Sequence, residues 1–176
     1  MNTSRQLLLI INPVSGIGSK DTIEPLVRSR LEPLGFEIST AYTCAHGDAT
    51  RLAGNAVDAG FYGVIAAGGD GTVNETAAAL CHSNTALGII PCGSGNGLAR
   101  HLGIPLDPLS AVKIIAENHI VKSDYGAVND MPFFCTFGVG FDAAVSSNFA
   151  RQHRRGKLAY IKSAISEYIK FHPQVY

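Results

Sequence analysis

The sequence contains 176 residues, of which 46% are hydrophobic and 16% are charged, and its formal net charge is zero. A chain of this length can bury the core of one full domain plus a remainder. Because a chain without net charge does not attract nucleic acid strongly, we expect no nucleic-acid partner.

The N-terminal part of the chain alternates between two kinds of hydrophobic pattern. Short apolar or alternating runs bounded by glycine, proline or polar residues predict strands over residues 7–11, 36–43, 62–67 and 86–91. Apolar residues at helical intervals predict helices over residues 21–34, 46–59, 72–80 and 107–116. The last of these begins at Asp107-Pro108 and is expected to turn Leu109, Val112, Ile115 and Ala116 inward. Strands that alternate with helices indicate an α/β fold, with a mainly parallel sheet covered by helices on both faces.

The pattern changes after Asn118. Residues 120–128 and 131–137 are predicted to be antiparallel strands around an Asn129-Asp130 turn, and helices are predicted over residues 142–149 and 157–171. We therefore predict an α/β domain over residues 1–119 and the start of a β-rich second domain, a sandwich, over residues 120–176. A hairpin with two helices does not make a stable domain, so this second domain is interpreted as truncated at Tyr176.

The most informative stretch of the chain runs from Gly68 to Glu75. Thr72 and Glu75 have the spacing of a capping box, which places the glycines before them at a strand-to-helix turn. Such a turn directs backbone N–H groups and the positive end of a helix dipole toward one point, where phosphate binds well. A second glycine-rich segment, residues 91–97, follows the next strand. Because glycine costs backbone entropy, folding needs alone explain two such segments poorly, and we predict a shared phosphate or nucleotide site.

Ligands of parallel sheets bind beyond the carboxyl ends of the strands. We name the segments expected there the first loop (Asn12–Lys20), the second loop (Thr43–Gly47), the third loop (Gly68–Thr72) and the fourth loop (Cys92–Gly97). They are predicted to converge on one crevice. Asp70 is the unusual member, because a carboxylate beside phosphates is repelled unless it holds a metal or receives a proton.

Five motifs resemble those of a known family. Gly68-Gly69-Asp70-Gly71-Thr72 resembles the signature shared by diacylglycerol kinases, sphingosine kinases, NAD kinases and phosphofructokinases. The fuller set resembles the catalytic domain of the diacylglycerol kinase and bacterial lipid kinase family, and it comprises residues 12–16, 69–75, 91–100, 124–129 and 138–143. Gly97 departs from the pattern, because family members frequently carry aspartate at that position.

The resemblance implies an ATP-binding first domain and a β-sandwich second domain whose later part supplies metal ligands and a carboxylate base. It implies nucleotide contacts at Asn12, Thr43, Gly68, Gly69, Asp70, Gly71, Thr72, Val73, Asn74, Glu75, Ser94 and Asn96. Asp70 is also expected to be catalytic or to contact a metal-bound water. Asp124 would support Mg²⁺ through water, with the direct metal ligands beyond Tyr176, and Arg100 would lie near the phosphates.

The resemblance thus implies an ATP-dependent lipid kinase that uses Mg²⁺ and passes the γ-phosphoryl group to a diacylglycerol-like lipid. Two alternatives stay open: an NAD kinase, which shares the glycine signature, and a non-catalytic nucleotide-binding module. A basic cluster at residues 151–157 leaves peripheral contact with a membrane surface open, and a homodimer stays open as well.

The cysteines and the N-terminus bear on the cellular compartment. The four cysteines form no C-x-x-C pair, which favours reduced thiols over a disulfide or metal role. Only five apolar residues follow the polar start, too few for a signal-peptide core or a membrane span. We therefore expect a cytoplasmic protein, and a place at the inner face of the membrane stays open.

Overall fold

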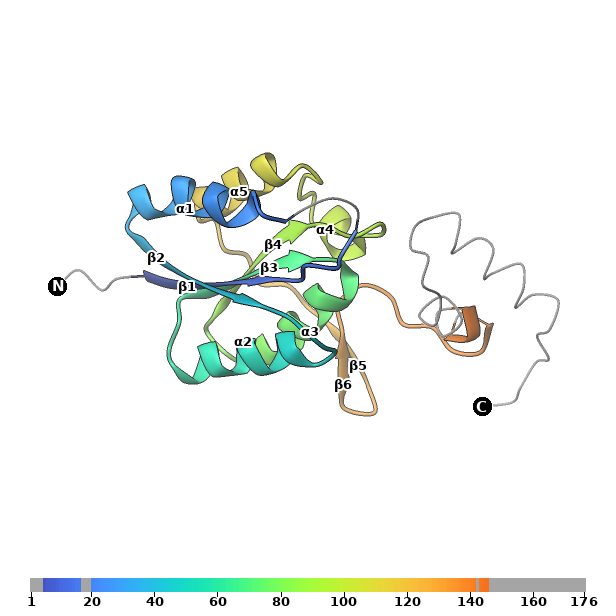
Figure 1. Ribbon diagram of the computed structural model, residues 1–176. Coiled ribbons are helices and arrows are strands. Elements are labelled where there is room, and N and C mark those ends of the chain that lie inside the picture. The colour runs from blue at the N-terminus through green and yellow to red at the C-terminus, as the bar shows by residue number, and fades with distance from the viewer. Residues whose placement is uncertain (1–4, 17–19, 142, 146–176) are drawn as a thin grey trace. The chain divides into compact units, whose positions relative to one another are not determined.

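The computed structural model of the chain describes residues 5–16, 20–141 and 143–145 (Figure 1). A first compact unit ends at Cys135, and a separate unit begins at Thr136. The first unit therefore includes the hairpin that the sequence predicts to open a second domain. The predicted division near residue 120 stays a prediction.

The first unit is built on a parallel sheet. Among the described residues the sheet has four strands, β1 (Arg5–Ile11), β2 (Phe36–Tyr42), β3 (Gly63–Gly68) and β4 (Ala86–Pro91), in the order β2-β1-β3-β4. Every neighbouring pair in this order is parallel. The chain thus runs outward from β1 to β2 and then returns to the other side of β1, so β1 and β3 flank a topological switch point, where such sheets bind ligands.

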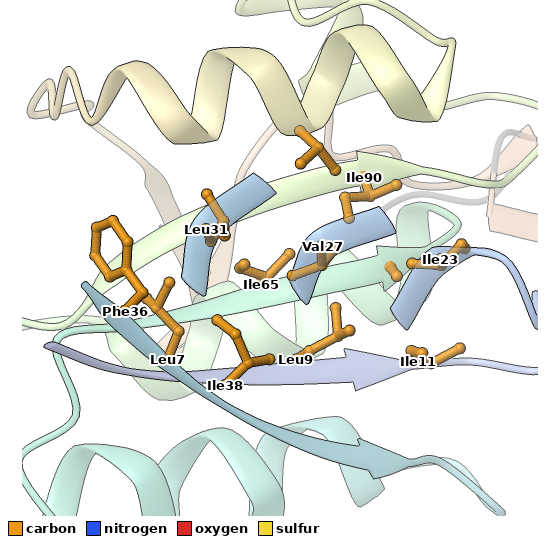
Figure 2. Packing of buried hydrophobic residues seen from close by; sticks show 12 residues of the cluster. Leu7, Leu9, Ile11, Ile23, Val27, Leu31, Phe36, Ile38, Ile65 and Ile90 are labelled. Atoms are coloured by element: carbon orange, nitrogen blue, oxygen red, sulfur yellow. The ribbon is translucent and has the colours of Figure 1, made fainter. Parts of the chain in front are cut away.

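Helices cover both faces of the sheet, as predicted (Figure 1). The helices are α1 (Ile23–Leu31), α2 (Asp48–Asp58), α3 (Asp70–Leu80), α4 (Gly97–His101) and α5 (Pro108–Glu117), and a 3₁₀ turn, η1 (Glu32–Leu34), extends α1. Because strand side chains alternate between faces, Leu9 packs toward α1 and α5, whereas Ile10 packs toward α2. Figure 2 shows Ile23, Val27 and Leu31 of α1 lying over the strand side chains on the same face of the sheet as Leu9.

The predicted capping box at Thr72 is wrong. α3 begins two residues earlier than predicted, at Asp70, with Gly69 as N-cap and no side-chain capping bond. Thr72 therefore lies inside the first turn, where its hydroxyl accepts a hydrogen bond from the amide of Asn12. The glycines still lie at a strand-to-helix turn, as predicted, but Gly71 belongs to the helix.

Two further differences concern short or marginal helical segments. α4 was not predicted, because five residues are too short for a helical period to show in the sequence. In α5 the predicted cap is confirmed, since Asp107 accepts a 2.9 Å bond from the Ser110 N–H. Leu109, however, is 38% exposed and Ala111 is buried instead, so the buried side of α5 is centred on Ala111 and Val112.

The hairpin consists of β5 (Gly126–Val128) and β6 (Met131–Phe133), which pair antiparallel. Asn129 and Asp130 both adopt left-handed φ values, 48° and 63°, which confirms the predicted turn. The strands are shorter than predicted, and the ring of Phe133 lies over Gly126. A 2.8 Å hydrogen bond between Tyr125 Oη and His82 Nε2 joins the segment before β5 to the turn after α3.

Of the later predicted helix 142–149, the structure describes residues 143–145, which are helical together with Phe141. The predicted helix 157–171 lies outside the described residues. In the part of the chain that the structure describes, no helix is both long and apolar enough to cross a membrane.

Candidate functional site

The first and third loops meet at the switch point. Asn12 Nδ2 donates a 2.9 Å hydrogen bond to Thr72 Oγ1, and Asn12 Oδ1 accepts a 3.1 Å bond from the Val14 N–H. The backbone of Asn12 continues the β1–β3 ladder with a 2.9 Å bond to the Ala67 carbonyl. Asn12 therefore fixes both the exit of β1 and the first turn of α3.

Backbone packing joins these two loops to the fourth loop. Gly16, with φ +63°, lies against the Cys92 carbonyl so closely that a Cβ would overlap it. A Cβ on Gly93 would lie 2.7 Å from the Cα of Gly69. These glycines are thus required by loop packing. For Gly93 the expectation that folding needs explain the glycine-rich segments poorly is therefore wrong.

Gly71 differs from these glycines. It is exposed in the first turn of α3, and a Cβ added there would meet nothing within 4 Å. The Val73 N–H bonds the Gly69 carbonyl at 3.0 Å, so the preceding helical N–H groups, those of Asp70, Gly71 and Thr72, have no acceptor within the helix. The start of α3 therefore presents N–H donors and the positive end of the helix dipole beside a space without side chains.

Asp70 connects the third loop to the fourth. Its Oδ2 accepts a 2.9 Å bond from the Asn96 N–H, and its Oδ1 accepts a 2.6 Å bond from the Gly97 N–H. A Cβ on Gly95 would lie only 2.6 Å from Asp70 Oδ2. The carboxylate is thus held at the start of α4 by neighbouring backbone donors.

The fourth loop is also braced from within. The Asn96 side chain is 7% exposed; its Oδ1 accepts from the Gly93 N–H at 2.9 Å and its Nδ2 donates to the Gly93 carbonyl at 2.7 Å. Arg100 Nε donates to the Gly95 carbonyl at 2.8 Å. Ser94 is exposed between these braces. The loop is therefore shaped by its own contacts, and Ser94 faces outward from it.

The second loop follows β2 and is joined to the end of β1, the neighbouring strand. Thr43 is buried, and its N–H bonds the Ile11 carbonyl at 3.0 Å. Asp48 Oδ2 accepts from the N–H groups of Cys44 and Ala45 at 2.8 and 3.0 Å, and these bonds, with a hydrogen bond from the Arg51 side chain, lower the pKa of Asp48. Asp48 was not among the predicted site residues, although an aspartate directly after the loop glycine is a signal for this brace.

The second loop also approaches the body of α3. His46 Nε2 lies 3.6 Å from Glu75 Oε1. Just after the loop, in the first turn of α2, Thr50 Oγ1 donates to the Glu75 carbonyl at 3.1 Å. The four loops therefore form a connected set around the first turns of α3.

The remaining predicted site residues fall into different places. Gly68 is the buried last residue of β3, Val73 packs in the core with Ala66 and Ile89, and Asn74 is exposed on α3. In the described part of the chain no hydrogen bond or ion pair joins Asp124 to the four loops; its carbonyl accepts from Ser123 Oγ at 3.2 Å. The structure thus joins predicted residues of the four loops by direct contacts.

The resemblance implies two ligands, ATP and Mg²⁺, and the N–H donors at the start of α3 fit the first of them. N–H groups at the start of an eleven-residue helix beside open space suit the phosphates of ATP. Over residues 5–16, 20–141 and 143–145, no group of three or more His, Cys, Asp or Glu side chains could hold a metal ion.

Comparisons with known proteins agree with the α/β class that the fold defines. The family model described as the diacylglycerol kinase catalytic domain matches residues 6–128. A diacylglycerol kinase of Staphylococcus saprophyticus is 39% identical over 127 residues, covering 71% of this chain and 42% of the relative. A probable YegS-like lipid kinase of Klebsiella pneumoniae is 38% identical over 145 residues, covering 80% and 47%.

Solved structures give the same result. A crystal structure of a diacylglycerol kinase from Bacillus anthracis superposes with a TM-score of 0.67 at 30% identity, covering 73% of this chain and 48% of that one. The chain belongs to the diacylglycerol kinase catalytic domain family. It spans about half the length of the curated relatives that it matches.

Proposed function

We propose that the protein carrying this chain is an ATP-dependent lipid kinase that passes the γ-phosphoryl group to the hydroxyl of a diacylglycerol-like lipid. The observation that carries this proposal is the connected set of loops around the free N–H groups of α3, in a chain of this family. Relatives named diacylglycerol kinase and lipid kinase support the choice of acceptor class.

Each loop has a proposed task in phosphate binding. The N–H groups of Asp70, Gly71 and Thr72 would bind the nucleotide phosphates, since a helix N-terminus stabilises negative charge. Asn12 holds Thr72 at that point, and exposed Ser94 supplies a hydroxyl from the fourth loop. Because these donors are fixed before the ligand arrives, they would lower the cost of positioning the transferred group.

The other predicted site residues keep proposed roles. Thr43 and Asn96 would shape the nucleotide pocket through the second and fourth loops, and Arg100 would add positive charge near the phosphates. Bound magnesium neutralises phosphate charge in phosphoryl transfer, and Asp124 is the residue of this chain proposed to support it through water. We also propose a cytoplasmic enzyme that contacts the membrane surface where its lipid acceptor resides.

A transfer assay with labelled ATP tests the proposal. The full-length protein is incubated with vesicles that contain diacylglycerol, other hydroxyl lipids or no acceptor, and with NAD in a separate arm. Label in a lipid supports the lipid kinase. Label in NAD favours the alternative of an NAD kinase, whereas ATP binding without transfer to any acceptor favours a non-catalytic nucleotide-binding module.

A further inference from the structure

Asp70 uses both carboxylate oxygens on backbone donors of another loop. The accepted N–H groups belong to the consecutive residues Asn96 and Gly97, at 2.9 and 2.6 Å. Hydrogen bonds to an ionised acceptor are stronger than neutral ones. One side chain at the start of α3 therefore holds the start of α4, a segment 26 residues later in the chain.

The packing around this contact leaves little room for a different arrangement. A Cβ on Gly95 would lie 2.6 Å from Asp70 Oδ2, and one on Gly97 would lie 3.6 Å from Asp70 Oδ1. Arg100 Nε, from within α4, donates a 2.8 Å hydrogen bond to the Gly95 carbonyl. The fourth loop can thus approach Asp70 closely only because glycine precedes Asn96, whereas a Cβ on Gly97 would make ordinary contact with the carboxylate.

We infer that Asp70 is a positioning residue, which acts on the ligand through the fourth loop that it ties to α3. The two N–H bonds compensate the charge of a carboxylate that would otherwise repel the phosphates nearby. They also hold the fourth loop in place before any ligand binds. This role depends on the proposed function only for the identity of the ligand, because the tie itself is a contact within the protein.

An amide cannot replace this carboxylate. Asparagine offers one acceptor oxygen and one NH₂ donor, so Asp70→Asn would satisfy one N–H group and place a donor against the other. An unsatisfied or opposed donor is costly. The contact of residue 70 with the N–H groups of Asn96 and Gly97 would therefore be lost in Asp70→Asn, even though the side chain keeps its size.

The test compares three variants of the full-length protein: Asp70→Asn, Gly95→Ala and the control Asp58→Asn. Gly95→Ala keeps the carboxylate but places a methyl group against it. Asp58 is an exposed acid at the last position of α2, so its variant controls for the lost charge. The readouts are amide hydrogen exchange at residues 96 and 97, and the dissociation constant of ATP with and without Mg²⁺.

We expect exchange at residues 96 and 97 to rise on the order of tenfold in Asp70→Asn and in Gly95→Ala. The ATP dissociation constant should rise by the same factor with and without Mg²⁺ in both variants, and Asp58→Asn should match the wild type. Should Asp70→Asn fail to fold, Gly95→Ala carries the same comparison with the carboxylate retained.

Two results would overturn the positioning role. One is wild-type exchange at residues 96 and 97 in both variants. The other is a loss of ATP affinity in Asp70→Asn that occurs only with Mg²⁺ and is absent from Gly95→Ala, because that points to a metal contact. If the wild type binds no ATP in either condition, the proposed function fails, and the exchange rates still decide the role of Asp70.

Discussion

Glycine serves two purposes in the loops around α3. At Gly16 and Gly93 any side chain would overlap the backbone of another loop, so these residues allow the loops to touch. At Gly71 a side chain would meet no protein atom, and a glycine inside a helix lowers stability. Gly71 therefore keeps space open beside the N–H donors of α3, which is what a bound phosphate requires.

Replacing Gly71 should change the stability of the fold and the affinity for ATP in opposite directions. We expect Gly71→Ala to raise the free energy of unfolding by about 0.5–1 kcal/mol, because alanine favours the helix. The same methyl group should weaken ATP binding, because it projects into the space beside the donors. Chemical denaturation measures the first effect and ATP titration the second.

Gly93→Ala provides the contrast to this variant. Its methyl group would lie 2.7 Å from the Gly69 Cα, so we expect a loss of stability together with the loss of ATP binding. Unchanged ATP affinity in a stabilised Gly71→Ala protein would show that the phosphates do not approach α3 at this residue.

Asp48, which braces the second loop, predicts that the conformation of this loop depends on pH. The N–H groups of Cys44 and Ala45 and the Arg51 side chain lower the pKa of Asp48 from its usual 3.8. A carboxyl with a lowered folded-state pKa stabilises the fold above its unfolded pKa, and this contribution is lost as the pH falls through the folded-state value. The second loop should therefore loosen only below the usual pKa of aspartate.

NMR titration of the Cys44 and Ala45 amides measures this effect. Their chemical shifts should stay constant from neutral pH down to the ordinary aspartate range and change together below it. Asp48→Asn should remove the transition. A transition that survives in Asp48→Asn would assign the titration to another group.

At the level of elements, the sheet and its covering helices were predictable because their patterns are local. The continuous apolar runs of β1 and β3 reflect burial on both faces, and the intervals of α1 and α2 reflect burial of one side. The start of α3 was mispredicted because Thr72 bonds Asn12, which is 60 residues away. No local pattern reports a partner at that distance.

The core of the sheet supports a prediction on stability. Ile65 in β3 is 1% exposed and belongs to the cluster that α1 and α5 cover. Ile65→Ala should lower the free energy of unfolding by about 2–5 kcal/mol, because it removes buried surface and leaves a cavity. Chemical denaturation measures the change.

Leu34→Ala is the matched control for Ile65→Ala. Leu34 is 55% exposed in η1, so its truncation should change stability by no more than about 0.5 kcal/mol. If both variants lost the same free energy of unfolding, the placement of Ile65 in the core of the sheet would be contradicted.

At the level of the whole molecule, the sequence predicted which loops would gather but not how they hold one another. The carboxyl ends of parallel strands share one edge, so four loops at one edge follow from the strand assignment. The contacts of Asp70 with Asn96 and Gly97 depend on the strand order β2-β1-β3-β4. Hydrophobic periodicity does not encode that order.

The hydrogen bonds at this edge also bear on the order of folding. Asn12 and Thr72 are 60 positions apart, and Asp70 and Asn96 are 26 apart. Closing such long segments costs chain entropy before any contact compensates for it. We therefore expect ATP binding to be acquired late in refolding, after β1, β3 and β4 have paired, so that nucleotide affinity would report on the completed sheet and not on its early helices.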